Sequence, residues 1–91
     1  MSRILNIGGA QLGPVLRSDT RSNVVKRMCD LLKQAKNKSC DIVIFPELCL
    51  TTFFPRWFFE DFSEVDEFFE TEMPNKDCEP LFDLAKKLNL A

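Results

Sequence analysis

Histidine is absent from this 91-residue sequence, and so are C-x-x-C pairs, long apolar runs and an excess of basic residues. Without histidine or paired cysteines, the usual ligands of a zinc site are missing. The 12 Lys and Arg against 14 Asp and Glu give a net charge of −2, which does not favour nucleic acid or an anionic membrane surface. No apolar run approaches the ~18 residues of a transmembrane helix. We therefore expect no metal, no cofactor, no nucleic acid and no membrane partner.

The four cysteines, Cys29, Cys40, Cys49 and Cys78, lack the spacing of a reactive pair. Three of them occupy apolar positions of expected elements, where a free cysteine behaves as a small hydrophobe. A reduced intracellular protein is therefore favoured over a disulfide scaffold or a redox protein. The first residues, MSRILNIGGAQLGP, are too short and too interrupted by polar residues and glycines for a signal peptide. We expect the cytoplasm.

The first half of the chain predicts a strand, a helix and a second strand. Ninety-one residues, 45% apolar and 29% charged, suit one small soluble domain. The strands are expected at residues 4–11 and 41–45. Gly8 and Gly9 weaken the first strand and indicate a bulge or a close backbone approach, and they do not continue into a dinucleotide-binding G-x-G-x-x-G. This order predicts a right-handed parallel βαβ unit and an α/β fold.

The helix between these strands has one apolar face. It is expected to start after Asp19 or Thr20 and to end near Lys38. Apolar side chains recur at helical period, namely Val24, Val25, Met28, Leu31, Leu32 and Ala35. Basic residues occupy the remainder, which is typical of a solvated face, so the charges receive no functional role.

Aromatic residues crowd the segment that follows the second strand: Phe53, Phe54, Trp57, Phe58, Phe59 and Phe62. We expect most of them to be core residues that cover the sheet edge. Phe54 and Trp57 are left open, because either could line a substrate pocket, which is mainly apolar. Arg56 is open too, since such an arginine either holds a carboxylate through two hydrogen bonds or is an ordinary surface residue.

Two helices are expected to follow. Ser63 is predicted to cap a short helix over residues 63–69, with Asp66 completing a capping box. Its inner side would consist of Val65, Phe68 and Phe69. The last helix is expected to open at Glu79 with Pro80 in its first turn and to end at Asn89 in the left-handed conformation. Its buried face would consist of Leu81, Phe82, Leu84, Ala85 and Leu88, and Leu90-Ala91 would start a further strand.

Glu47 is the candidate catalytic residue. It follows the strand IVIF and the strand-ending Pro46. Functional groups of open α/β sheets collect in the crevice at the carboxyl ends of the strands. The strand is expected to be buried on both faces, and apolar neighbours, Phe45, Leu48, Phe53 and Phe54, would desolvate the carboxylate and suit it to carry protons near neutral pH. The plainer interpretation is a solvated loop or helix-start carboxylate.

The run FPELCLTTFFPRW, with ETEMP at residues 70–74, resembles the carbon–nitrogen hydrolases of the nitrilase superfamily, and N-carbamoyl-D-amino-acid hydrolases in particular. A first strand ending in Gln11, followed by L-G-P, matches the same family. The resemblance covers essentially the whole chain but only the amino-terminal part of a longer family domain. It implies a partial α-β-β-α sandwich, with residues 1–91 as an amino-terminal fragment of a single hydrolase domain.

The chemistry that the resemblance implies uses a Glu base, a Lys that stabilises the oxyanion and a Cys nucleophile. Glu47 matches the base, whereas the Lys and Cys have no counterpart among these residues, and Cys49 falls where the family has small apolar residues. The implied substrate is an N-carbamoyl amino acid or an amide, and the full-length enzyme would be a homo-oligomer. We expect residues 1–91 alone to be inactive and prone to associate. The alternative is a non-catalytic α/β binding or assembly module.

Overall fold

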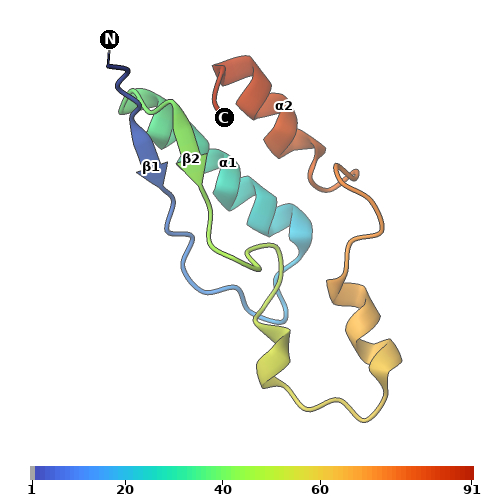
Figure 1. Cartoon of the computed structure of the whole chain (residues 1–91). Coiled ribbons are helices and arrows are strands. Elements are labelled where there is room, and N and C mark those ends of the chain that lie inside the picture. Colours follow the sequence, from blue (N-terminus) through green and yellow to red (C-terminus); the bar gives the residue numbers. More distant parts are fainter. Residues whose placement is uncertain (1) are drawn as a thin grey trace.

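Two short parallel strands form the sheet of the computed structural model, which describes residues 2–91, and lie near the N-terminal end of the molecule (Figure 1). Strand β1 (Ile7–Gly9) pairs with strand β2 (Ile42–Ile44), so that Ile7 lies opposite Ile42 and Gly9 opposite Ile44. The predicted α/β fold with parallel strand, helix, strand order is confirmed. Both strands are shorter than expected, because hydrogen-bonded pairing extends only a residue or so beyond each end.

Helix α1 (Arg21–Asn37) connects the two strands and matches the predicted helix. It starts at Thr20, whose hydroxyl accepts a hydrogen bond of 3.1 Å from the N–H of Asn23 and so satisfies one free donor of the first turn. The predicted apolar face is confirmed: Val24, Val25, Met28 and Leu32 are buried. Val24 and Met28 form the core with Leu12 from the turn after β1.

Gly8 permits a close approach between β1 and the turn that enters β2. A Cβ atom at Gly8 would lie 3.0 Å from the Sγ atom of Cys40, which is tighter than most real Cβ contacts. Gly8 pairs in regular register with Val43, so there is no bulge at this position. The bulge interpretation is therefore wrong: Gly8 leaves room for the side chain of Cys40, whereas a Cβ atom at Gly9 would meet nothing within 4 Å.

Helix α2 (Glu79–Leu88) ends as the sequence predicts, with Asn89 left-handed at φ 55° and ψ 48°. The chain then turns back to the sheet and buries Leu90. The N–H of Ala91 donates to the carbonyl of Asp41 (3.1 Å), and the N–H of Val43 donates to the carbonyl of Ala91 (2.9 Å). This is the bonding pattern of a third parallel strand on the other side of β2, as predicted from Leu90-Ala91.

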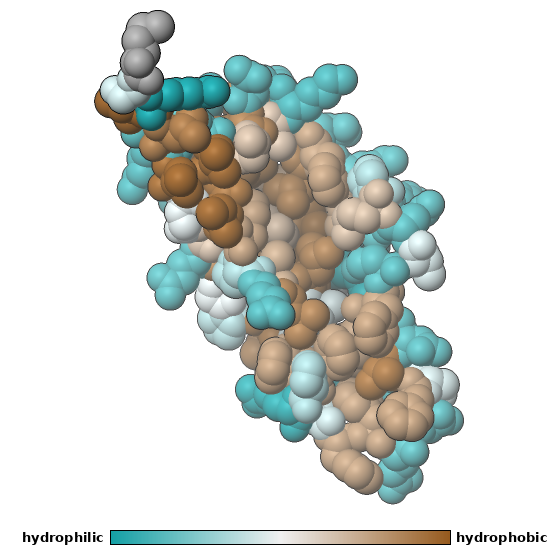
Figure 2. All heavy atoms as spheres, viewed as in Figure 1, coloured by the Kyte–Doolittle hydropathy of each residue, from teal (hydrophilic) through white to brown (hydrophobic). Residues whose placement is uncertain are grey.

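Helices α1 and α2 lie side by side and cover one face of the sheet (Figure 1). The other face is open, with Ile7 60% and Ile44 58% exposed. Strongly hydrophobic side chains gather over β1 and β2 on this face (Figure 2). The prediction that residues 41–45 are buried on both faces is wrong, because residues 2–91 supply a covering layer to one face only.

The segment between β2 and α2 extends away from the sheet and gives the molecule its long axis of 56 Å, against 24 and 23 Å across (Figure 1). It contains two 3₁₀ helices, η1 (Phe54–Arg56) and η2 (Phe62–Phe68). Asp61, rather than Ser63, caps η2 by accepting a 3.0 Å hydrogen bond from the N–H of Ser63. The predicted capping box is therefore wrong, since a nearer carboxylate takes the capping position.

The aromatic residues of this segment are mostly outside the core. Phe58 and Phe62 are 88% and 89% exposed, and Phe53 is 60% exposed. Expecting most of them to be core was wrong, because the segment packs largely on itself.

Two further predicted core residues are exposed, and geometry explains both. Phe69 lies in extended backbone after η2, and Phe82 lies about 100° away from the inner face of α2.

The helices are short or amphipathic. Within residues 2–91, none combines the length and the apolar character needed to cross a bilayer.

Candidate active site

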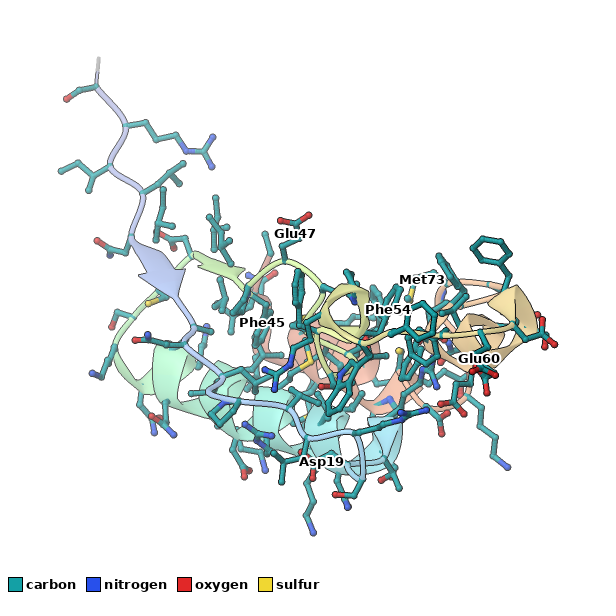
Figure 3. The ribbon with its side chains drawn as sticks, turned by 90° about the horizontal axis from the view of Figure 1, so that it is seen from below. Asp19, Phe45, Glu47, Phe54, Glu60 and Met73 are labelled. Carbon is teal, nitrogen blue, oxygen red and sulfur yellow. The ribbon has the colours of Figure 1, made fainter. Side chains whose placement is uncertain are left out.

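Glu47 lies on the loop that leaves the carboxyl end of β2, where the sequence predicts it. Its carboxylate points away from helix α1, toward the side of the open sheet face (Figure 3). The side chain is exposed, so the predicted apolar enclosure around Glu47 is wrong for residues 2–91. The open face explains this, because nothing covers the loop from that side.

Leu48, directly after Glu47, has a positive φ of 53°. A side chain branched beyond Cβ rarely adopts this conformation, which costs about 1–3 kcal/mol and occurs preferentially at functional sites. The turn fixes the direction in which Glu47 leaves the strand. Sequence reasoning missed this feature, since leucine carries no signal for the left-handed region.

Glu47 lines a cavity of about 250 Å³ between the loop after β2 and the turn after β1. Leu12 anchors this turn in the core, and Gly13 allows its sharp bend at φ 81°. Arg27 of α1 donates hydrogen bonds to the carbonyls of Leu12 (2.5 Å) and Pro14 (3.1 Å). One wall of the cavity is thereby held by the helix.

The opposite wall of the cavity contains a buried polar residue, Thr52. Thr52 is only 7% exposed, and its carbonyl accepts hydrogen bonds from the N–H of Phe54 (2.7 Å) and the hydroxyl of Thr51 (3.0 Å). These bonds lie directly before η1, whose last residue, Arg56, lines the same cavity as Glu47. The cavity thus joins a carboxylate, a guanidinium and the apolar side chains of Leu48 and Phe53.

The structure separates the roles left open for Phe54 and Trp57. Phe54 stacks on Phe68 with ring centroids 5.0 Å apart, so it packs against η2 and is outside the cavity lining. Trp57 is 39% exposed. Its ring makes cation–π contacts with two guanidinium groups, those of Arg56 at 5.2 Å and Arg17 at 5.7 Å from the ring centroid. Neither aromatic ring lines the cavity that contains Glu47.

Cys49 lies in the cavity wall but lacks the environment of an activated nucleophile. Burial raises the pKa of the Cys49 thiol, whereas a reactive cysteine needs a lowered one. Burial also raises the pKa of Cys29 and of Cys78, and all four cysteines are free. Across residues 2–91, no group of three or more His, Cys, Asp or Glu residues is placed to hold a metal ion.

A polar network behind the aromatic segment was missed by the sequence reasoning. The carboxylate of Glu70 accepts from the guanidinium of Arg21 on α1 and, at 2.6 Å, from the side-chain amide of Asn75. Asn75 in turn accepts from the N–H of Cys78 (3.0 Å) at the start of α2. The network joins the amino-terminal ends of both helices to the ETEMP segment. The only signal for Glu70 was its place in that motif.

The family model described as carbon–nitrogen hydrolase matches residues 6–91. The matched range runs from the residue before β1 to Ala91 and includes Glu47, Arg56 and Glu70.

Proposed function

This chain belongs to the carbon–nitrogen hydrolase family, and from that premise we propose that Glu47 is the general base for hydrolysis of a non-peptide carbon–nitrogen bond. The observation that carries the proposal is the place of Glu47: it follows the end of β2, directly before the strained residue Leu48, on a cavity lined in part by apolar side chains. An accessible carboxylate in such a cavity is able to reach a substrate or a nucleophile.

The proposed reaction takes an N-carbamoyl-D-amino acid to a D-amino acid, ammonia and carbon dioxide. Glu47 takes the proton of a Cys thiol that other residues of the domain supply, and the thiolate attacks the carbamoyl carbon. Ammonia leaves with a proton returned by Glu47. Glu47 then deprotonates a water that attacks the thioester carbon, the thiol is regenerated, and the released carbamate decomposes to the amine and carbon dioxide. A Lys of the same domain would stabilise the oxyanion.

The carbamoyl specificity rests on the thirteen residues FPELCLTTFFPRW together with ETEMP. Residues 1–91 are proposed to be the amino-terminal part of one hydrolase domain, whose other parts cover the open sheet face and complete the catalytic set. The full enzyme would be a homo-oligomer and would need no cofactor. Without the nucleophile, the 91-residue chain would have no hydrolase activity of its own.

A non-catalytic α/β binding or assembly module is the second candidate. The exposure of Glu47 favours it, because a base working near neutral pH is usually shielded from water. The coding sequence after Ala91 distinguishes the two: an in-frame continuation with a strand–Lys and a strand–Cys segment supports the enzyme, and a stop codon with a well-folded product supports the module.

The experiment that tests the function is a substrate panel. Residues 1–91 are co-expressed with the remainder of an N-carbamoyl-D-amino-acid hydrolase, and ammonia release is measured with N-carbamoyl-D-alanine, its L enantiomer, D-alaninamide and a simple nitrile. The proposal predicts turnover of the N-carbamoyl-D-amino acid above the others. Preference for the amide or the nitrile would keep the hydrolase assignment and reject the carbamoyl substrate.

A further inference from the structure

The hydroxyl of Thr52 has no hydrogen-bond partner within residues 2–91, although Thr52 is the one polar residue of this range that is buried. Its carbonyl accepts two hydrogen bonds, but its side chain takes part in none. In the same range, no side-chain nitrogen or oxygen is both enclosed and unpaired. The unpaired hydroxyl of Thr52 must therefore reach an open space beside the residue.

The neighbouring threonine shows the contrast. The hydroxyl of Thr51 donates to the carbonyl of Thr52 at 3.0 Å and so helps to hold the loop. The hydroxyl of Thr52 has no such structural task. A polar group that is taken out of bulk water without a partner lowers stability, and a ligand atom that pairs with it removes that penalty. The hydroxyl of Thr52 is therefore suited to bind a ligand.

Thr52 borders two cavities, and in one of them the polar groups are already paired within the protein. This cavity, of about 310 Å³, lies at the start of α1. Asp19 accepts a backbone N–H at 2.8 Å, Thr20 caps the helix, and Arg21 forms an ion pair. Groups that satisfy one another leave little for a small neutral ligand to bind.

The other cavity, of about 250 Å³, is the one that Glu47 lines. Its two charged residues, Glu47 and Arg56, are exposed, whereas the neutral Thr52 is buried. A sheltered hydroxyl suits an uncharged hydrogen-bonding group, because a hydrogen bond is stronger where water competes less. The volume is several times the ~30 Å³ share of one water, so a small organic molecule fits.

We propose that the hydroxyl of Thr52 accepts a hydrogen bond from the NH₂ of the substrate's carbamoyl group and thereby selects this group over an acyl group of the same shape. This inference rests on the proposed function and adds the residue that recognises the carbamoyl end. An N-acetyl group has a methyl in place of the NH₂ and would leave the hydroxyl unpaired. Because the NH₂ departs as ammonia, the contact also holds the leaving group on the cavity of Glu47.

Ligand-observed NMR on the 91-residue chain tests the contact without hydrolysis. The probes are N-carbamoyl-D-alanine and N-acetyl-D-alanine, which differ only by NH₂ against CH₃. We expect saturable binding of the carbamoyl compound, about tenfold tighter than that of the acetyl compound. Thr52→Val removes the hydroxyl at nearly constant shape and should bring this ratio of affinities to about one, by weakening the carbamoyl compound alone. Thr52→Ser keeps the hydroxyl and should retain most of the ratio.

Thr51→Val is the matched control, because Thr51 lines the same cavity but its hydroxyl is bonded to the Thr52 carbonyl. It should keep the ratio and lower the midpoint of urea unfolding. Thr52→Val should leave that midpoint unchanged or raise it, since an unpaired hydroxyl is removed. The carbamoyl contact would be overturned by a ratio that stays high in Thr52→Val, an equal fall in Thr51→Val, a lowered midpoint in Thr52→Val, or no saturable binding to the unmodified chain.

The contact and the proposed function fail in different ways. If the ratio depends on Thr52 while the co-expressed enzyme releases no ammonia from a carbamoyl substrate, the proposed function fails and the contact stands. If that enzyme hydrolyses the carbamoyl substrate and the ratio does not depend on Thr52, the function stands and the contact is rejected.

Discussion

Phe54 and Phe68 stack face to face, with 5.0 Å between ring centroids and 3° between ring planes. The pair connects η1, which carries Arg56, to η2, and Phe69 adds an edge-on contact at 5.6 Å. Stacked aromatic pairs contribute about 0.5–1.5 kcal/mol beyond the area they bury. The geometry of the loop after Glu47 therefore depends on a contact between residues 14 positions apart.

Phe68→Leu should loosen the segment from η1 to η2, because the ring that holds Phe54 is lost. Cleavage by a glutamate-specific protease within residues 60–72 should become about fivefold faster, as expected for a loss of about 1 kcal/mol in local stability. Phe62→Leu is the control, since Phe62 is 89% exposed and its replacement should leave the rate nearly unchanged. Equal rates for the two variants would argue that the stack does not hold the segment.

Glu70→Gln should destabilise the start of both helices. The substitution removes the ion pair with Arg21, whose side chain is 24% exposed, and weakens the bond to Asn75. We expect a loss of about 1–2 kcal/mol at low salt, read as reduced hydrogen-exchange protection at the amino-terminal turns of α1 and α2. Glu72→Gln changes the same residue type close by, where only the backbone carbonyl accepts from Asn75. A similar effect from Glu72→Gln would show that the network is not responsible.

The open sheet face should make the 91-residue chain associate. Ile7 and Ile44 stand on the same face of the β1–β2 pair and are both more than half exposed. The double substitution Ile7→Thr with Ile44→Thr keeps β-branching and lowers the apolar area, so sedimentation should show a larger monomer fraction. Leu16→Thr, at a 61% exposed position away from the sheet, should change association little. A chain that is already monomeric and unfolds sharply and reversibly would contradict the prediction.

The rates at which Cys49 and Cys78 are alkylated should be low at pH 7 and rise with pH, because burial raises the pKa of both thiols. Burial raises the pKa of Cys49 and of Cys78, so the thiolate fraction of each is small at pH 7 and grows only as the pH rises past the ordinary thiol value. Since folding favours the protonated thiols, their contribution to stability is complete below the unfolded pKa and is lost as the pH rises through the folded pKa. Alkylation followed by mass spectrometry measures the rates. Fast modification of Cys49 at pH 7 would contradict the raised pKa and indicate an activated thiol.

The predictable part of the fold is the part governed by local rules. Thr20 caps α1, the periodic apolar residues from Val24 to Leu32 face inward, and Asn89 ends α2 in the left-handed conformation. Each of these outcomes depends on residues within one or two helical turns. Glu47 at the end of β2 follows equally from the buried-strand pattern and the proline after it.

The part of the fold that the sequence did not predict depends on which layers cover the sheet and on contacts between residues far apart in the chain. Strand β2 has an apolar sequence suited to two covered faces, but covering depends on what packs over it, and Ile44 is exposed here. Glu70 pairs with Arg21 across 49 positions, which composition and periodicity do not encode. The positive φ of Leu48 and the shared cavity of Glu47 and Arg56 arise from the path of the loop, for which leucine and arginine give no signal.

Glu47 as the catalytic base is the central claim, and ammonia release from N-carbamoyl-D-alanine by residues 1–91 co-expressed with the remainder of the enzyme tests it most directly. Glu47→Gln, which keeps the shape and removes the base, should lower the rate about a hundredfold or more. Glu60→Gln, at an exposed glutamate outside the cavity, should leave it unchanged. Turnover by the Glu47→Gln variant within a few fold of the unsubstituted protein would contradict the claim.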